Sequence, residues 1–259
     1  MAPELWVSAA VGSALALGLA LERVAPHESV RPAWGVNLGI WLAATALRAA
    51  VFGGAEWQLA RWSEGGHFGL LQAAAAPGWL AIGVTVLGLD LVSYLWHRAN
   101  HAVPFLWRFH RVHHADPALH VSTALRFHPG EILMSVPVRL AAVAALGAPV
   151  AGVVVFECVF GAMNALEHAR FALPAPLERA LQLWLVTPAL HRVHHSVVRR
   201  EHDSNYATTF TLWDRAGRSF RANDPASHFP IGLGPGETGD PRALGAMLLE
   251  PFRARGPVT

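Results

Sequence analysis

Four long apolar runs limit what this chain can fold into. They cover residues 5–21, 35–53, 69–96 and 132–166. An apolar run of about 20 residues is long enough to cross a bilayer as a helix. The last run is too long for one crossing, and Gly147 and Pro149 split it into a pair of helices. The third either tilts or breaks at Pro77 and Gly78. We therefore expect an all-α, multi-pass membrane helical bundle of about four spans.

The composition agrees with a membrane location. Hydrophobic residues make up 53% of the chain and charged residues only 15%, whereas soluble domains average about 25% charged residues. Arg23 is the first basic residue and no clear cleavage site follows the first run, so we interpret that run as a retained span. The basic residues are all arginine and are scattered, which argues against nucleic-acid binding. The single cysteine, Cys158, excludes an intramolecular disulfide or a cysteine-ligated metal site.

The two polar stretches, residues 98–131 and 169–259, flank the predicted helix pair. Because the pair leaves the membrane face and returns to it, both stretches are expected on one side. Most of the arginines lie there, so the positive-inside rule predicts that this side is cytoplasmic. The same reasoning places residues 55–66 in an outer loop. We expect one domain over residues 1–259, with a motif-bearing core at about 85–215 and a loop-rich tail at 223–259.

Most of the 15 histidines are gathered in four short segments of this polar material. The first segment has two histidines four residues apart, and the pentapeptide HRVHH occurs at 110–114 and again at 191–195. Residues three and four apart share one face of a helix, so each segment would point its imidazoles the same way. The candidate metal ligands are His97, His101, His110, His113, His114, His168, His191, His194 and His195.

The number of these histidines indicates more than one metal. Imidazole binds Zn, Cu, Fe and Ni, so the ligand type alone does not select the metal. Nine ligands exceed the three or four of a zinc site and favour two metals of higher coordination. The alternative is a membrane protein that transports or buffers metal. Its sites would lie at mid-membrane, whereas these segments lie at helix ends and in polar stretches. A scaffold without activity would not need so complete a ligand set.

The same segments resemble the sterol desaturase / fatty acid hydroxylase superfamily of membrane histidine-box di-iron enzymes. The resemblance covers about residues 85–215 and includes, besides the histidines above, Asp90, Tyr94, Arg98, Leu106, Trp107, Thr123, Arg126, His128, Pro129, Glu131, Thr187, Pro188, Arg192, Asn205, Tyr206, Trp213 and Asp214. The chain departs from the usual pattern at His120, Arg170 and Ala207, which replace residues other than the box histidines.

The resemblance implies a helical membrane domain with a cytosolic, histidine-rich helical cap that holds two iron ions. There O₂ would be used to oxidise a C–H bond of a lipid. Hydroxylation and desaturation both remain open, and we favour hydroxylation because the superfamily uses it more widely. The chain has no haem, flavin or nicotinamide motif, so the electrons would come from an external donor of the ferredoxin, cytochrome b5 or reductase type. We expect no catalytic residue beyond the metal ligands.

Four further residues are candidates for a metal or for the groups around it: His128, Asn164, Asp90 and His120. Asn164 lies four residues before a box histidine, on the same helical face, and could orient a water at the metals. Asp90 lies seven residues before His97 in an apolar run, where an unpaired charge is costly. We expect it to accept a hydrogen bond from a ligating imidazole. The other acidic residues of this region are interpreted as surface charge or helix caps: Asp116, Glu131, Glu167, Asp203 and Asp214.

Overall fold

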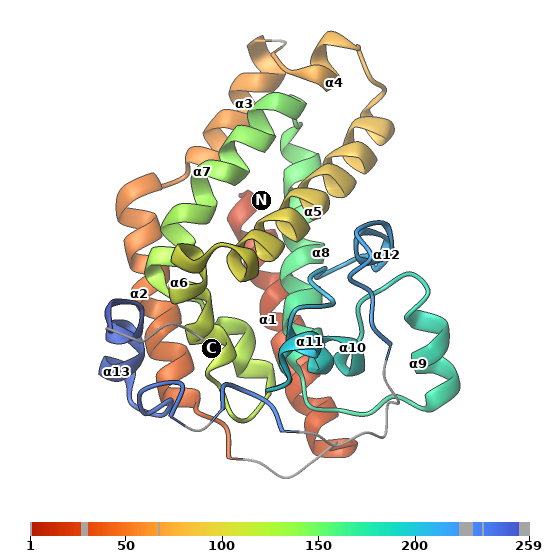
Figure 1. Ribbon diagram of the computed structural model, residues 1–259. Helices are drawn as coiled ribbons and strands as arrows, with labels where there is room; N and C mark the ends of the chain where they lie inside the picture. Colours follow the sequence, from red (N-terminus) through yellow and green to blue (C-terminus); the bar gives the residue numbers. More distant parts are fainter. Residues whose placement is uncertain (1, 27–30, 67, 223–229, 235, 254–259) are drawn as a thin grey trace.

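The computed structural model describes residues 2–26, 31–66, 68–222, 230–234 and 236–253 (Figure 1). Within these ranges the chain is helical, and β-structure is limited to three isolated bridges. The longer helices are α1 (Pro3–Val24), α2 (Trp34–Phe52), α3 (Ala55–Gly66), α5 (Gly78–Ala102), α6 (Pro104–His114), α7 (Pro129–Leu146) and α8 (Val150–His168). The short ones are α4 (Leu70–Ala73), η1 (Val121–Leu125), α9 (Ala175–Leu181), α10 (Pro188–His194), α11 (Arg199–His202), α12 (Leu212–Ala216), α13 (Leu244–Leu249) and η2 (Glu250–Phe252).

Five helices are long and apolar enough to cross a membrane: α1, α2, α5, α7 and α8. Only 11% to 28% of the most apolar stretch of each is buried inside the protein. Large apolar side chains such as Leu42 and Trp79 point outward and are 54% and 76% exposed, as expected for helices that face lipid. The all-α membrane bundle is therefore confirmed, with five candidate spans against the expected four or so.

The helices end or begin at the glycine and proline residues where the sequence predicted breaks in the apolar runs. Pro77 precedes the first residue of α5, and Gly147 separates α7 from α8 with a left-handed backbone (φ +63°). Gly69 also has a positive φ of 97°, and a Cβ built on it would lie 2.2 Å from the backbone nitrogen of Gly147. Two backbones therefore meet at the end of the bundle, at positions that only glycine fills without strain.

The bundle is built around α8. Helix α1 packs along α8, while α5 packs against both α7 and α8. Their shared core includes Leu89, Val143, Val153 and Phe156, all at most 1% exposed. Residues 55–66, expected as an outer loop, form helix α3, which packs on α7 and α8. The expectation of a loop was wrong because Trp57 and Ala60 place an apolar stripe on this otherwise polar segment, and both are buried in the core. The outer location of the segment stays a prediction.

The polar stretches form a cap at one end of the bundle, where α6, η1, α10 and α11 gather (Figure 1). Arg126, completely buried, ties this cap together. It donates hydrogen bonds to the carbonyl of Val112 at 2.8 Å, to Oδ1 of Asn37 on α2 at 3.0 Å, and to the carbonyl of Pro241 at 2.8 Å. A buried guanidinium needs such partners, so the cap is fixed to the membrane helices by polar as well as apolar contacts.

The tail is more structured than expected. Residues 223–229, 235 and 254–259 lie outside the described residues, but 244–252 form α13 and η2. Met247 on α13 is fully buried against Val36 and Ile40 of α2. A single buried apolar residue on so short a helix gives no periodic pattern in a segment rich in glycine and proline.

Candidate metal centre

The four histidine segments lie on four helices, α5, α6, α8 and α10. His97 and His101 lie on the last turns of α5, and Pro104 opens α6 one residue after α5 ends. Proline suits the first turn of a helix because its missing N–H would be unpaired there anyway. Pro188 opens α10 in the same way, with the Thr187 hydroxyl as the cap of that helix. Each copy of HRVHH therefore lies on a short helix with a fixed start.

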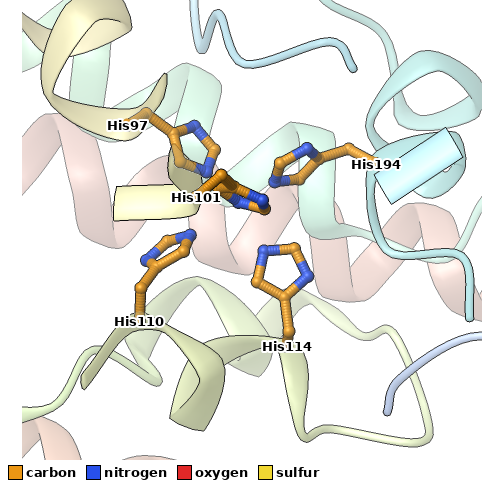
Figure 2. A group of neighbouring side chains, drawn as sticks. All are labelled: His97, His101, His110, His114 and His194. Carbon is orange, nitrogen blue, oxygen red and sulfur yellow. The ribbon is translucent and has the colours of Figure 1, made fainter. Parts of the chain in front are cut away.

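The structure brings the nine box histidines together in two sets. The five-histidine set is His97, His101, His110, His114 and His194, and the four-histidine set is His113, His168, His191 and His195. Within each set, one ring nitrogen per residue lies within 4.8 Å of those of all the others. Figure 2 shows the five rings converging on one space from α5, α6 and α10. Every histidine that the sequence predicted as a ligand thus falls in one set or the other.

In the five-histidine set, three of the five rings have a hydrogen-bond partner at Nδ1, on the side away from the centre of the set. The Nδ1 atoms of His97 and His194 lie 2.7 Å from the carbonyl oxygens of Tyr206 and Ser204. The Nδ1 atom of His110 lies 2.8 Å from Oε1 of Glu131. The Nε2 atoms of these rings are buried and have no hydrogen-bond partner among the described residues. An imidazole that donates outward through Nδ1 presents the lone pair of Nε2 inward, as metal-binding histidines do.

The four-histidine set shows the same orientation through its ring-to-ring distances. The Nε2 atom of His168 lies 3.1 Å from that of His113 and 2.9 Å from that of His191, which is 3.1 Å from that of His195. Two nitrogens bound at right angles to one ion at about 2.1 Å lie about 3 Å apart. The four imidazoles are therefore spaced as ligands of a single metal ion, and the donor set fits one.

Burial keeps these imidazoles in the form that binds metal. Desolvation, with a smaller contribution from neighbouring imidazoles, lowers the pKa well below the usual 6.5 for His113, His114, His191, His194 and His195. A metal binds only the neutral ring, so no proton has to be displaced at neutral pH.

Carboxylates surround the two sets. Besides its contact with His110, Glu131 accepts a hydrogen bond from Asn100 at 3.2 Å. An oxygen of Glu167 lies 3.6 Å from Nδ1 of His191, and Oδ1 of Asp203 lies 3.4 Å from Nδ1 of His101. These three were interpreted from sequence as surface charge or caps, which is corrected here: each lies where it can orient a ligating ring and increase its basicity.

The segment after the second HRVHH supplies the backbone carbonyls. Asp214 accepts hydrogen bonds from the backbone N–H of Tyr206 at 2.8 Å and of Ala207 at 3.0 Å. Asn205 donates to the carbonyls of Leu190 and Arg221 at 3.1 and 2.8 Å. These contacts fix the loop whose carbonyls meet the five-histidine set. The sequence identified Asn205, Tyr206 and Asp214 as members of the motif. It could not show that backbone carbonyls of this loop contact the histidines, because every residue has a backbone carbonyl.

The structure places three of the further candidates outside both sets. His120 lies 2.5 Å from Glu22 on α1, and His128 caps α7 by accepting a hydrogen bond from the N–H of Gly130. Asp90 accepts hydrogen bonds from the indole N–H of Trp213 at 2.8 Å and from the N–H of Phe210 at 3.3 Å. None of these contacts involves a box histidine, and Asp90 is partnered by the cap instead of by the imidazole that the sequence predicted.

His202, which is not among the candidates named from the sequence, lies beside the five-histidine set. Its ring stacks on that of His114 at 5.2 Å, and together with His101 and Asp203 it forms a third group of metal-binding side chains. Burial lowers the pKa of His202 to about 4, while the nearby Asp203 carboxylate partly offsets that effect. Since this third group shares His101 with the larger set, it extends that set and is not an independent site.

A cavity of about 220 Å³ opens beside both sets. Its walls include His97 and His110 from the larger set and His113, His168 and His191 from the smaller one. The remaining wall is largely apolar and comes from the membrane helices and the cap, with Val92, Trp96, Phe127, Ile132, Val138 and Phe160. Asn164 also lines it, next to His168. A hydrocarbon chain from the membrane would be shielded from water there and would meet both sets.

A helical bundle with five candidate membrane spans and two sets of histidines that could each hold a metal ion, beside a largely apolar cavity, is the arrangement expected of a membrane metalloprotein. The sequence pattern of the fatty acid hydroxylase family matches residues 82–219, which is more than half of the chain and contains all nine box histidines. The chain belongs to the fatty acid hydroxylase family, which confirms the resemblance that the histidine segments indicated.

Individual relatives agree with this family. The ornithine lipid hydroxylase OlsE of Rhizobium tropici is 32% identical over 66% of this chain and 51% of its own length. Human alkylglycerol monooxygenase is 31% identical over 53% of this chain and 30% of its own. A cholesterol 25-hydroxylase-like protein of Danio rerio is 30% identical over 55% of this chain and 57% of its own. The chain thus spans a third to somewhat over half of these relatives. No solved structure matches it.

Proposed function

We propose that the protein uses O₂ to hydroxylate a C–H bond of a lipid at two iron ions held by the nine box histidines. One observation carries the proposal: two adjacent sets of imidazoles border a single, largely apolar cavity among the membrane helices. Two metals beside a hydrocarbon-sized space suit oxidation of an unactivated chain better than they suit storage or transport of metal. A transport site would lie midway along the helices, whereas these ligands lie at the ends of α5 and α8 and in the cap.

Bound iron would supply the oxidising power that no protein side chain has, with one O₂ and two electrons from an external donor. The reaction balances as lipid C–H plus O₂, two electrons and two protons giving lipid C–OH and water. The electron donor would be a ferredoxin, cytochrome b5 or reductase type of partner. By the positive-inside rule we place the cap, and with it the donor, on the cytoplasmic side.

The chain's own residues hold the metals, bind the lipid and exclude water. The five-histidine set would hold one ion and the four-histidine set the other, with Glu131 and two carbonyls orienting the rings of the first. The side-chain amide of Asn164 donates a hydrogen bond of 3.1 Å to the carbonyl of Ala124, and the backbone carbonyl of Asn164 lies 2.6 Å from Nδ1 of His168. We infer that the backbone carbonyl fixes that ring and that the side-chain amide orients a water in the cavity. An alanine at position 164 with unchanged activity would refute this role.

The names of the relatives support the reaction class. An ornithine lipid hydroxylase, an alkylglycerol monooxygenase and a cholesterol 25-hydroxylase-like protein all carry names of enzymes that insert oxygen into lipids. We therefore favour hydroxylation over desaturation for this chain.

The test is incorporation of labelled oxygen. The iron-loaded protein in detergent would be given a panel of fatty alcohols, sterols and glycerolipids with ¹⁸O₂, a ferredoxin and its reductase. We expect one labelled oxygen atom in a lipid product, found by mass spectrometry. A double variant with His113→Ala and His194→Ala, one histidine from each set, should give none, whereas His128→Gln should keep the activity. Absence of labelled product with every lipid class, in protein that holds iron, would contradict the proposal.

A further inference from the structure

A second cavity adjoins the lipid-binding one inside the bundle. It measures about 340 Å³, and the two cavities share wall residues Ile132, Ser135, Arg139 and Phe160. Its wall is still mostly apolar, but it carries more polar and charged side chains than the wall of the first cavity. We call it the polar chamber and define it by its polar wall residues Glu4, Ser8, Arg48, Glu56, Arg139 and Glu157.

The charges of the polar chamber lie among helices that are expected to cross the membrane. Arg48, Arg139 and Glu157 belong to α2, α7 and α8. Arg139 forms an ion pair with Glu157, and Arg48 lies 3.2 Å from Glu56. Ionisable side chains at membrane depth are costly and usually mark a route or a binding site for a substrate. Neither pair has a role in holding the histidine sets, since none of these residues lines them.

One acceptor in the polar chamber has no donor. Oε1 of Glu56 is buried near the Glu157 carboxyl group and has no donor among the described residues while both groups are ionised; its other oxygen faces Arg48. The Glu56 side chain is only 6% exposed. A buried acceptor left without a donor is destabilising, so a ligand that brings a hydroxyl hydrogen would satisfy it.

The charge balance of the polar chamber limits which ligand fits. Three carboxyl groups face two guanidinium groups, so the chamber has no excess of positive charge even if one carboxyl group is protonated. The carboxylate of a fatty acid or the phosphate of a phospholipid would find both arginines already paired. An uncharged hydroxyl group would disturb neither pair.

Helix α7 sets the distance between the polar chamber and the metal centre. Glu131 contacts His110 of the five-histidine set, and Arg139 follows eight residues later on the same helix. At 1.5 Å per residue the two lie about 12 Å apart along the axis. A substrate that reaches from one to the other must have a long apolar body with a polar group at one end.

We propose that the polar chamber binds the hydroxyl end of an uncharged amphiphilic substrate, whose apolar body lies in the first cavity with a carbon about 12 Å from that hydroxyl beside the histidine sets. The inference rests on the proposed function. It adds the class of substrate, and it states that the oxidised carbon is selected by its distance from the hydroxyl end of the substrate.

Binding tests the chamber without any need for turnover. The purified protein in detergent is titrated with 1-hexadecanol and with hexadecanoate, and binding is followed by the rise in its thermal unfolding midpoint. We expect the alcohol to bind about tenfold or more tightly than the acid, the size of one hydrogen bond to a charged group. Glu56→Gln should reduce this preference about tenfold, because it removes a negative charge next to the acid. Glu64→Gln on the same helix is the matched control, since Glu64 caps the backbone N–H of Val150 outside the chamber and should leave the preference intact.

Equal binding of alcohol and acid by the unchanged protein would overturn the proposal, and so would equal effects of the two glutamine variants. If Glu56→Gln does not fold, the position of oxidation in the unchanged enzyme decides instead. In alcohols of 14, 16 and 18 carbons the new hydroxyl should lie at a constant distance from the first one. A constant distance from the methyl end would refute the chamber. If the protein prefers the alcohol but oxidises no lipid, the substrate-binding role of the chamber stands and the proposed function is refuted. If it oxidises alcohol and acid alike, the proposed function stands and the role of the chamber is refuted.

Discussion

The two copies of HRVHH have the same sequence but divide their histidines in opposite ways. In the first copy, His110 and His114 belong to the five-histidine set and His113 to the other. In the second copy, His191 and His195 belong to the four-histidine set and His194 to the larger one. Each copy thus gives its i, i+4 pair to one set and its i+3 residue to the opposite set.

Helix geometry explains why one pentapeptide can serve two metals. Successive residues are about 100° apart around a helix, so the adjacent histidines at the fourth and fifth positions diverge, while the first and fifth positions differ by only about 40°. The α6 and α10 copies approach the centre from different sides, and each therefore reaches both sets. The remaining ligands complete the two sets unequally: α5 adds a pair to the larger one, and α8 adds only His168 to the smaller.

The largest effect is expected from breaking one set at a time. His110→Ala should disable the five-histidine set and His191→Ala the four-histidine set, and each should abolish lipid oxidation, because the reaction needs both metals. The measurement is labelled oxygen in the product, with His128→Gln as the control outside both sets. Substantial activity in either alanine variant would show that one set is dispensable.

A smaller effect should distinguish the carboxylates that face the two sets. Glu131→Gln removes a contact of 2.8 Å to His110 and is expected to weaken metal binding by about 10- to 100-fold. Glu167→Gln should weaken it less, since its oxygen is 3.6 Å from His191. Competition with a coloured chelator measures both affinities. If the Glu167 variant lost more affinity than the Glu131 variant, the distances would not reflect the strength of the contacts.

Acid should destabilise the metal-free protein through both sets. Burial lowers the pKa of histidines such as His113 and His194 well below 6.5, whereas in the unfolded chain they take up protons near that value. Below it the unfolded state binds more protons, so the free energy of unfolding falls by about 1.4 kcal/mol per pH unit for each such histidine. For His202 the loss continues down to its pKa of about 4. Thermal unfolding between about pH 7.5 and 5.5 measures this; a midpoint that does not fall would contradict it.

The smallest effect is expected at the histidine that the sequence placed near the metals and the structure does not. His128→Gln should leave the metal content of both sets unchanged. It should cost about 1 kcal/mol of stability, because it disturbs the capping contact to Gly130. Chemical denaturation and elemental analysis of the same sample give both values. A loss of metal in this variant would show that His128 does contribute to the metal centre.

The sequence was informative wherever a short-range pattern determines the structure. Apolar run length predicted the spans, glycine and proline predicted the breaks at Pro77 and Gly147, and histidine spacing predicted which histidines gather in the two sets. It could not show how the ligands divide, because that depends on how α6 and α10 face each other across the cap. Contacts between segments distant in the sequence, such as that of Asp203 with His101, could not be predicted for the same reason.

The polar chamber shows a signal that was visible but not used. Arg139 and Glu157 stand as charged residues inside the apolar run 132–166, which is unusual at membrane depth. Their pairing across α7 and α8, and their place next to the lipid cavity, needed the three-dimensional arrangement. Asp90 carried the same signal, and its partners in the cap could not be identified from sequence.

The division of the histidines into two metal sites is the central claim, and metal counting tests it most directly. Iron-loaded protein and the variants His101→Ala and His168→Ala, whose histidines lie outside the repeated pentapeptide, would be analysed for metal per chain. The account predicts about two ions in the unchanged protein and about one in each variant, each loss confined to its own set. One ion in the unchanged protein, or the same single ion lost in both variants, would show that the nine histidines form one site and would contradict the account.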